Sequence, residues 1–262
     1  RECSRRSVSS VRSVTKCQQG WPPVAMSPCC QCCAKCCLHE PMKIPLDLAV
    51  QSDILKTAVD EGPEIVRVSK FYKESKDGKF VSYLSPDART LYDTFRKGAK
   101  ESNNGKCLGW HDGPSRPYQW LHYNETLLRA RNLGSGLVSL GLAPTPATYI
   151  GIYSQNCPEW VLVEQGAYCY SMVIVPLYDT LGPDACAFII NQADISVVVC
   201  ENDAKCNLIL DRAPRCLRKL IVIHETRLAT NQRAKNRGIE VLRLEDIEKN
   251  GAIKNHPEVP PE

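Results

Sequence analysis

Short apolar segments alternate with amphipathic segments along the second half of the 262-residue chain. Five segments rich in β-branched residues are predicted strands: ATYIGIYS, MVIVPLY, ISVVVC, KLIVIHE and the first part of GIEVLRLEDIEKNG. Three of the four segments that separate them have apolar residues at helical spacing, so strands and helices alternate. This alternation is typical of a parallel sheet that is covered by helices on both faces, and α/β is therefore the predicted fold class.

Capping residues predict where several helices begin. In SPDARTLYDTFRKGAKES, Ser85 is the predicted N-cap and Pro86 is the predicted first helical residue. Asn124 is the predicted cap of the next helix, which ends near Gly141. Asn156 is predicted to start the helix PEWVLVEQGAYCY, whose first residue is a proline.

The chain divides into three predicted regions. Residues 1–41 are rich in Ser, Arg and Cys, and we expect a disordered leader because few apolar side chains there can be buried. Residues 42–118 are an arm with a helix and a predicted hairpin, SKFYKESKDGKFVSYL, that turns at Lys76-Asp77-Gly78. Residues 119–262 begin within the predicted strand YQWLHY and contain the α/β pattern. They are predicted to form an α/β domain that is incomplete.

Composition and charge indicate a globular protein without a basic face. Apolar residues make up 43% and charged residues 24% of the chain, and the formal net charge is +4. This excess lies in the first forty residues, which hold six Lys or Arg against two Glu. The rest of the chain is balanced, which argues against nucleic acid as a partner. The longest apolar stretch, residues 160–178, is interrupted by Glu164 and Gln165 and is a predicted buried helix and strand rather than a membrane span.

Cysteines are crowded near the start of the chain. Eight of the 15 precede residue 38, and six of these lie in CCQCCAKCC at residues 29–37. Cys30 and Cys33 have the CxxC spacing of metal sites, and His39 is the nearby imidazole. Three interpretations stay open: metal binding, palmitoylation that tethers the chain to a membrane, and a poorly structured leader, which we favour. The other seven cysteines are scattered through predicted strands and helices, which suits free thiols in a reducing compartment.

Known phosphate-binding motifs are not found in the sequence. Gly105-Lys106-Cys107 lacks both the glycine spacing and the hydroxyl residue of a Walker loop. Gly134-Ser135-Gly136 falls inside a predicted helix, where small residues permit close packing. The chain has no GxSxG, HExxH or EF-hand pattern either.

Two residues have positions that suit chemistry, and for each we prefer a structural role. His224 ends a predicted strand and would lie at the carboxyl edge of the sheet, where ligands of α/β proteins bind. Cys157 lies at a predicted helix start, where a thiol pKa can be lowered, but no His partner can be assigned to it. Trp160 and Tyr170 suit the packing of a buried helix better than the stacking of a ligand.

Several blocks of the sequence occur in a distinctive order. They are PYQWLHYNE, YIGIYSQNCPEW, VPLYDTLG and FIINQADISVVVC, and DARTLYDTFRKG and NNGKCLGW precede them. These blocks resemble the eukaryotic long-chain acyl-CoA synthetases, which belong to the adenylate-forming superfamily. The resemblance runs from about residue 64 to about residue 248. It implies the N-terminal subdomain of the large domain of such an enzyme, whereas residues 1–41 stand where many members have a hydrophobic anchor.

The resemblance implies a long-chain fatty-acid–CoA ligase. Such enzymes use ATP and Mg²⁺ to form an acyl-adenylate, from which coenzyme A takes the acyl group. In the family, the phosphate loop, the adenine-binding residues and the lid with its catalytic lysine follow the part of the sheet that is represented here. We therefore expect no catalytic, cofactor-binding or metal-binding residue within this chain, and no activity from this chain alone.

The resemblance also implies partners and a location. The substrate would be a long-chain fatty acid, and the protein would work at the cytosolic face of the endoplasmic reticulum, the mitochondrial outer membrane or the peroxisome, in association with the membrane. Two alternatives stay open. One is a non-catalytic interaction protein that derives from a truncated synthetase, and the other is a Cys-rich metal-binding module fused to an inert α/β domain.

Overall fold

The computed structural model describes residues 52–54, 67–69, 83, 85–111, 113, 115–178, 180, 182–212 and 214–262. The chain divides into two units, residues 1–78 and residues 79–262. In the first unit, the strands β1 (Ser52–Ile54) and β2 (Arg67–Ser69) form an antiparallel pair. The cysteine cluster at residues 29–37 and the predicted hairpin turn at residues 76–78 lie outside the described residues.

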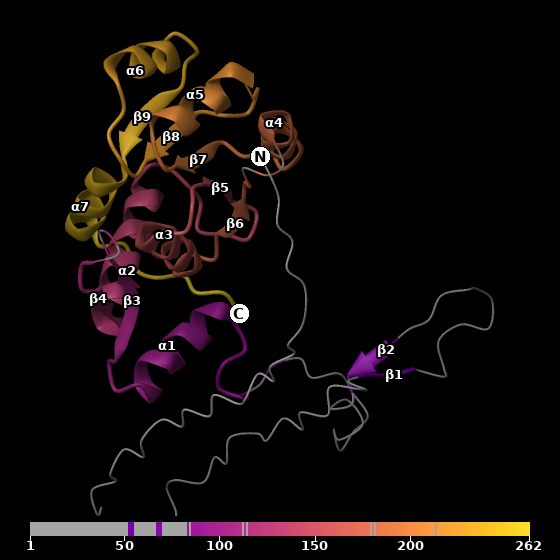
Figure 1. Ribbon diagram of the computed structural model, residues 1–262, viewed down its shortest axis with the longest axis vertical. Coiled ribbons are helices and arrows are strands. Elements are labelled where there is room, and N and C mark those ends of the chain that lie inside the picture. Colours follow the sequence, from indigo (N-terminus) through magenta and orange to yellow (C-terminus); the bar gives the residue numbers. More distant parts are fainter. Residues whose placement is uncertain are drawn as a thin grey trace, which may run out of the picture. The chain divides into compact units, whose positions relative to one another are not determined.

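A five-stranded parallel sheet forms the centre of the second unit (Figure 1). Its strands are β5 (Tyr149–Tyr153), β6 (Val173–Pro176), β7 (Val197–Cys200), β8 (Lys219–Val222) and β9 (Glu240–Arg243). Their spatial order is β6-β5-β7-β8-β9, and every neighbouring pair is parallel. All five predicted strands are present, so the prediction of a parallel α/β sheet is confirmed.

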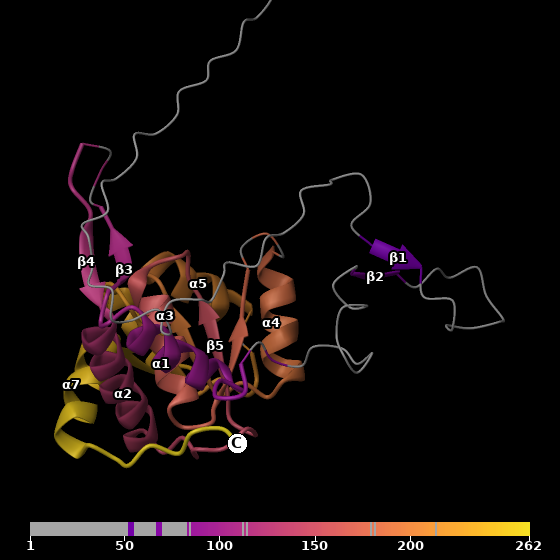
Figure 2. The same cartoon turned by 90° about the horizontal axis from the view of Figure 1, so that it is seen from below.

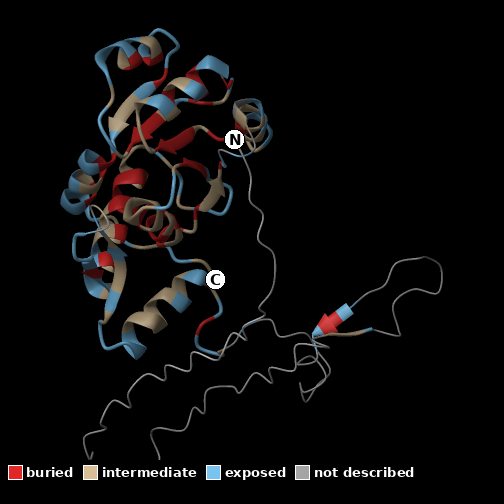
Figure 3. Ribbon diagram, in the orientation of Figure 1, coloured by how far each residue is buried: buried red, intermediate tan, exposed pale blue. Residues whose placement is uncertain are grey.

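Helices cover both faces of this sheet. One face carries α2 (Tyr123–Ser139), α3 (Pro158–Tyr168) and α7 (Leu244–Lys254), and the other carries α4 (Gly182–Gln192), α5 (Asp203–Arg212) and α6 (Leu228–Lys235). Alternate strand residues supply the two cores: Val197 and Val199 pack on the α2 side, and Val198 and Cys200 pack on the α4 side. Figure 3 shows the buried residues concentrated in the strands and on the helices around them. The predicted coverage of both faces is confirmed.

A helix and a two-stranded ribbon precede α2. The helix is α1 (Leu91–Glu101), and the ribbon consists of the antiparallel strands β3 (Lys106–Trp110) and β4 (Gln119–His122). β4 runs directly into α2, and its residue Leu121 is buried. In Figure 2 the ribbon projects from the unit on the side toward which the sheet strands point, which is the side of their carboxyl ends.

Helix α1 begins later than predicted. Its N-cap is Thr90, whose hydroxyl accepts a hydrogen bond from the Asp93 N–H at 3.1 Å, while the Asp93 carboxylate accepts one from the Thr90 N–H at 3.1 Å. Ser85 instead bonds to Asp87 in a turn that also contains Pro86, and a bridge joins Ser85 to Ala88. The prediction of Ser85 was wrong because only Thr90 has a carboxylate three residues later, which completes a capping box.

The predicted caps of α2 and α3 are also wrong, by two residues and by one. α2 begins at Tyr123, so Asn124 lies inside its first turn, where the backbone N–H of Asn124 donates to Asn104 Oδ1 at 2.8 Å. The N-cap of α3 is Cys157 rather than Asn156, and neither helix has a side-chain hydrogen bond at its N-cap. The end of β4 fixes the start of α2, and the restricted φ of the proline at the first position favours the start of α3.

Small residues bring α2 close to α3 and α7, as Gly134-Ser135-Gly136 predicts. A Cβ added to Gly134 would lie 2.3 Å from the Gly166 carbonyl oxygen in α3. A Cβ added to Gly251 in α7 would lie 1.8 Å from the Asn132 carbonyl oxygen. The buried Ser135 hydroxyl donates to the Gly251 carbonyl oxygen at 2.9 Å. The prediction of close packing at this motif is confirmed.

Residues 255–262 form a strap that crosses the connection between α3 and β6. The Val259 N–H donates to the Cys169 carbonyl oxygen at 2.9 Å, and the Tyr170 hydroxyl donates to the His256 carbonyl oxygen at 2.8 Å. The Ser171 hydroxyl donates to the carbonyl oxygen of Val259 at 2.7 Å. Main-chain groups of the strap are therefore held along its length.

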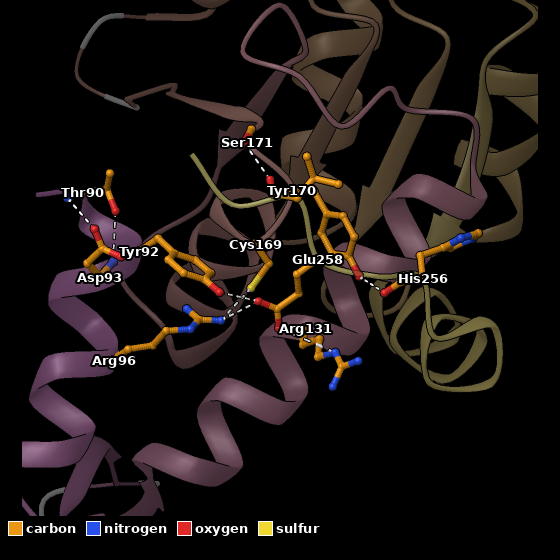
Figure 4. Close-up of polar contacts among 11 residues, drawn as sticks. Thr90, Tyr92, Asp93, Arg96, Arg131, Cys169, Tyr170, Ser171, His256 and Glu258 are labelled. Atoms are coloured by element: carbon orange, nitrogen blue, oxygen red, sulfur yellow. Dashed lines mark hydrogen bonds and ion pairs between the residues drawn. The ribbon is translucent and has the colours of Figure 1, made fainter. Parts of the chain in front are cut away.

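Glu258 in the strap forms a clasp with α1 (Figure 4). Its carboxylate accepts a hydrogen bond from the Tyr92 hydroxyl at 2.6 Å and one from the Arg96 guanidinium at 2.9 Å. Arg131 of α2 approaches the same carboxylate at 3.6 Å. Burial, together with the hydrogen bond to Glu258, raises the pKa of the Tyr92 hydroxyl, so Tyr92 is a hydrogen-bond donor at neutral pH.

Candidate functional site

The strand order places a reversal of the chain path at β5. From β5 the chain moves outward to β6, returns to the other side of β5 as β7, and continues through β8 to β9. In open parallel sheets such a reversal leaves a crevice outside the carboxyl ends of the strands, where ligands bind. The carboxyl ends of β5, β6 and β7 therefore define the candidate site.

A pocket of about 640 Å³, here called the carboxyl-edge pocket, opens at this place. It is lined by residues at the ends of β5 and β6 and at the start of α3: Ile152, Ser154, Gln155, Asn156, Trp160, Pro176, Leu177, Tyr178 and Thr180. The lining combines hydroxyl and amide groups with aromatic and aliphatic surface, and none of these side chains is charged. Such a lining suits an apolar or neutral part of a ligand that makes few hydrogen bonds.

Glu201 links the carboxyl ends of the neighbouring strands β5 and β7 by hydrogen bonds. Its backbone N–H donates to the Tyr153 carbonyl oxygen at 3.0 Å, and its carboxylate accepts from the Gln155 N–H at 3.0 Å. The Asn202 amide donates to the other carboxylate oxygen at 3.2 Å. Because both carboxylate oxygens already accept hydrogen bonds, Glu201 fixes the turn that carries Ser154 and Gln155 into the pocket.

The Cys157 thiol is not activated. Burial raises the pKa of Cys157, and this effect outweighs the lowering by the Ser154 hydroxyl, whose oxygen lies 3.6 Å from the sulfur. A thiol with a raised pKa is protonated at neutral pH and is a poor nucleophile. A helix start can lower a thiol pKa, but at Cys157 desolvation by burial has the largest effect, which agrees with the structural role that we preferred for this residue.

His224 lies at the carboxyl edge of the sheet, as predicted, two residues after β8. Its side chain is exposed, and its backbone N–H donates to the Glu201 carbonyl oxygen at 3.0 Å. Tyr170 is buried, which confirms its packing role, whereas Trp160 packs against the core on the α2 side and also lines the pocket. The structure thus brings Trp160 to the carboxyl-edge pocket, and neither His224 nor Cys157 lines it.

No binding residue was predicted from the sequence, and the pocket residues Ser154, Gln155, Tyr178 and Thr180 were not predicted to have a role. The available signal was their position directly after two predicted strands, where polar side chains meet the carboxyl edge. Among the described residues, no three His, Cys, Asp or Glu side chains gather as a metal site requires. In the same part of the chain, no helix combines the length and the apolar character that a membrane span needs.

Residues 95–261 match the family model for AMP-binding enzymes. The match covers more than half of the chain and extends from α1 to the strap, so it includes the sheet and the carboxyl-edge pocket. The chain belongs to the AMP-binding enzyme family.

Within this family the similarity to fatty-acid ligases is high. The chain is 40% identical over 187 residues to long-chain-fatty-acid–CoA ligase 6 of Mus musculus, which covers 70% of this chain and 27% of the ligase. It is 35% identical over 237 residues to long-chain-fatty-acid–CoA ligase 6 of Homo sapiens, which covers 86% of this chain and 32% of the ligase. The chain therefore spans less than a third of the length of these relatives.

Solved structures show the same fold at low identity. The adenylation domain of a carboxylate reductase from Mycobacterium chelonae superposes with a TM-score of 0.56 at 14% identity, over 68% of this chain and 31% of that chain. An anthranilate CoA ligase in complex with anthranoyl-AMP superposes with a TM-score of 0.53 at 15% identity, over 69% of this chain and 31% of that chain. At these identities the likeness concerns the fold alone.

Proposed function

We propose that this chain is part of a long-chain fatty-acid–CoA ligase and supplies the first portion of its AMP-binding domain. The observation that carries the proposal is the 35–40% identity to such ligases over 70–86% of the chain. A fold that is shared at 14% identity with the adenylation domain of a carboxylate reductase does not indicate which reaction is catalysed. The much higher identity to fatty-acid ligases favours the activation of a fatty acid.

In this proposal the longer enzyme joins a long-chain fatty acid to coenzyme A, and bound ATP and Mg²⁺ supply the adenylate chemistry. The residues at the carboxyl-edge pocket do not fit the triphosphate or the metal. A triphosphate needs cations or clustered N–H donors, and Mg²⁺ needs carboxylates, whereas none of the described residues that line this pocket is charged. We therefore assign the phosphates and the metal to other parts of the longer enzyme.

The role that we assign to this chain is to hold and shape an uncharged part of the site. Trp160, Leu177 and Tyr178 offer apolar surface, and Ser154 and Thr180 offer hydroxyl groups. Glu201 holds the turn after β5 in place, which keeps one side of the pocket rigid. We also propose that the longer enzyme works at a cytosolic membrane face of the endoplasmic reticulum, mitochondrion or peroxisome, which localisation of a fluorescent fusion tests.

An assay of pyrophosphate release tests whether this chain is active alone. Purified chain 1–262 is incubated with palmitate, ATP, Mg²⁺ and coenzyme A. We expect no turnover above background, because loss of even one preorganised donor lowers a rate by about 10²–10³, and the sequence contains no Ser/Thr/Gly-rich loop that ends in Pro-Lys-Gly. Turnover that disappears on Cys157→Ser or His224→Gln substitution would place the chemistry inside this chain and refute the proposal.

The transcript beyond codon 262 separates this proposal from a non-catalytic interaction protein. An in-frame segment that contains the phosphate loop, with ligase activity in the longer product, supports the ligase. In that product, Tyr178→Ala should raise the KM for the fatty acid or coenzyme A because the pocket loses apolar surface. An in-frame stop after codon 262 would instead favour the interaction protein.

A further inference from the structure

One face of the β3–β4 ribbon carries exposed aromatic side chains. Tyr118 and Trp120 have 60% and 40% of their surface exposed. The Trp120 ring lies on Gly109 of the paired strand, where an added Cβ would be 2.7 Å from the ring. The Tyr118 ring centroid lies 5.8 Å from that of Trp120 and 5.0 Å from that of His111. We call His111, Tyr118 and Trp120 the aromatic strip.

Positive charge lies beside the aromatic strip. Lys106 Nζ is 5.2 Å from the centroid of the Trp120 ring, which is within the range of a cation–π contact. The sequence from 105 to 123 has Lys106 and Arg116 against Asp112, so the ribbon has a net positive charge. The surface thus combines apolar rings, polar ring tips and an excess of cationic side chains.

The aromatic strip is not needed to hold the ribbon against the body of the unit. The opposite face makes that contact, because Leu121, whose side chain lies on the other side of the strand from Trp120, is buried. A large side chain that packs across the paired strand does stabilise a two-stranded ribbon, and Trp120 on Gly109 provides such a contact. Tyr118 adds a largely exposed ring just before the start of β4, which this structural role does not require.

We propose that the aromatic strip binds the interfacial region of a phospholipid bilayer. Trp and Tyr favour this region because the ring meets the acyl chains while the N–H or hydroxyl group stays hydrated. Lys106 and Arg116 complement the lipid phosphates. The ribbon projects on the side of the carboxyl ends of the sheet (Figure 2), so a bilayer bound there lies on the side of the carboxyl-edge pocket. This binding does not depend on ligase activity.

Vesicle flotation tests the proposal with the full 262-residue chain. The probe is unilamellar vesicles of phosphatidylcholine and phosphatidylserine. We expect the wild-type chain to float with the vesicles and the double variant Tyr118→Ser/Trp120→Ser to bind on the order of tenfold more weakly, because two interfacial rings are lost. The matched control is Leu228→Ser in α6, which removes a side chain that is 84% exposed and should bind like the wild type.

Three results would overturn the proposal. If the wild-type chain does not float with the vesicles, it has no bilayer-binding site. If the double variant binds vesicles as strongly as the wild type, the vesicle contact lies elsewhere in the chain. A dimer seen by sedimentation in the wild type but not in the double variant, without flotation, would assign the strip to a second copy of the chain. If circular dichroism shows that the double variant is unfolded, Tyr118→Ser alone replaces it, since this change leaves Trp120 on Gly109, and it too must weaken vesicle binding.

Discussion

Replacing Gly251 by Ala should destabilise the second unit, because this residue sets the distance between α7 and α2. The new Cβ would lie 1.8 Å from the Asn132 carbonyl oxygen and 2.4 Å from the Gly136 nitrogen. Both atoms belong to the backbone, so no side chain can rotate to make room. In proteins a Cβ essentially never lies closer than 3.0 Å to a heavy atom that it is not bonded to. The new Cβ and the Asn132 oxygen must therefore move apart by more than 1 Å.

The expected loss follows from the contacts that this separation breaks. The Ser135 hydroxyl donates to the Gly251 carbonyl oxygen and accepts from the His256 N–H, each at 2.9 Å. Two such hydrogen bonds contribute about 1 kcal/mol each, and overpacking costs about 1–3 kcal/mol. The higher helix propensity of Ala offsets about 1 kcal/mol. The free energy of unfolding should therefore fall by roughly 2–4 kcal/mol, which lowers Tm by roughly 5–15 °C.

Thermal and urea unfolding followed by circular dichroism measure this loss. The matched control is Ile253→Ala in the same helix, which truncates a side chain that is 80% exposed and should change stability by less than about 0.5 kcal/mol. Equal stability of Gly251→Ala and the wild type would mean that α2 and α7 separate without loss. That result would refute the argument that this glycine is required by close backbone packing.

Two substitutions and one reaction rate test the capping box, the Glu258 clasp and the Cys157 thiol. Thr90→Ala should lower the free energy of unfolding by about 1 kcal/mol in urea titrations. The Thr90 hydrogen bond holds the pKa of the Asp93 carboxyl below its usual value. The stabilisation is therefore present above the pKa of Asp93 in the unfolded state and is lost as pH falls through its pKa in the folded state. A stability difference between wild type and Thr90→Ala that grows toward acid pH would contradict this. Cys157 should react with iodoacetamide more slowly than a model thiol near pH 8, because burial raises its pKa; equal rates would argue against it. Glu258→Gln should increase hydrogen exchange in residues 91–101, since the Arg96 ion pair is lost, and unchanged exchange would show that the clasp does not hold α1.

The strands of the sheet were predictable because each is an apolar run bounded by turn residues. β7 is the clearest case, since all four of its residues are buried. Helix α6 was not predicted, because LATNQRAK buries only Thr230 and Ala234 and so has no apolar stripe. Strand β3 was missed for another reason: its pairing with β4 is a tertiary contact, and Gly109 within it weakens the local strand signal.

The candidate site depended on facts that are not local in the sequence. Ser154 and Thr180 each follow a predicted strand, but only the order of strands brings them to one pocket. The position of Cys157 at a helix start was predictable, whereas its burial was not. Burial decides the direction of its pKa shift, so the helix-start position alone could not predict that direction.

Helix α1 has no buried residue, and its anchor is made much later during synthesis. Tyr92 and Glu258, which join in the clasp, are 166 positions apart. At about 5–20 residues per second on the ribosome, roughly 8–33 s separate the addition of these two residues. Throughout that interval the nascent α1 has its capping box but no partner in the strap. Until Glu258 is added, α1 depends on its packing against α2 and α3, where the Phe95 ring centroid lies 5.1 Å from that of Tyr123, and the strap secures it only afterwards.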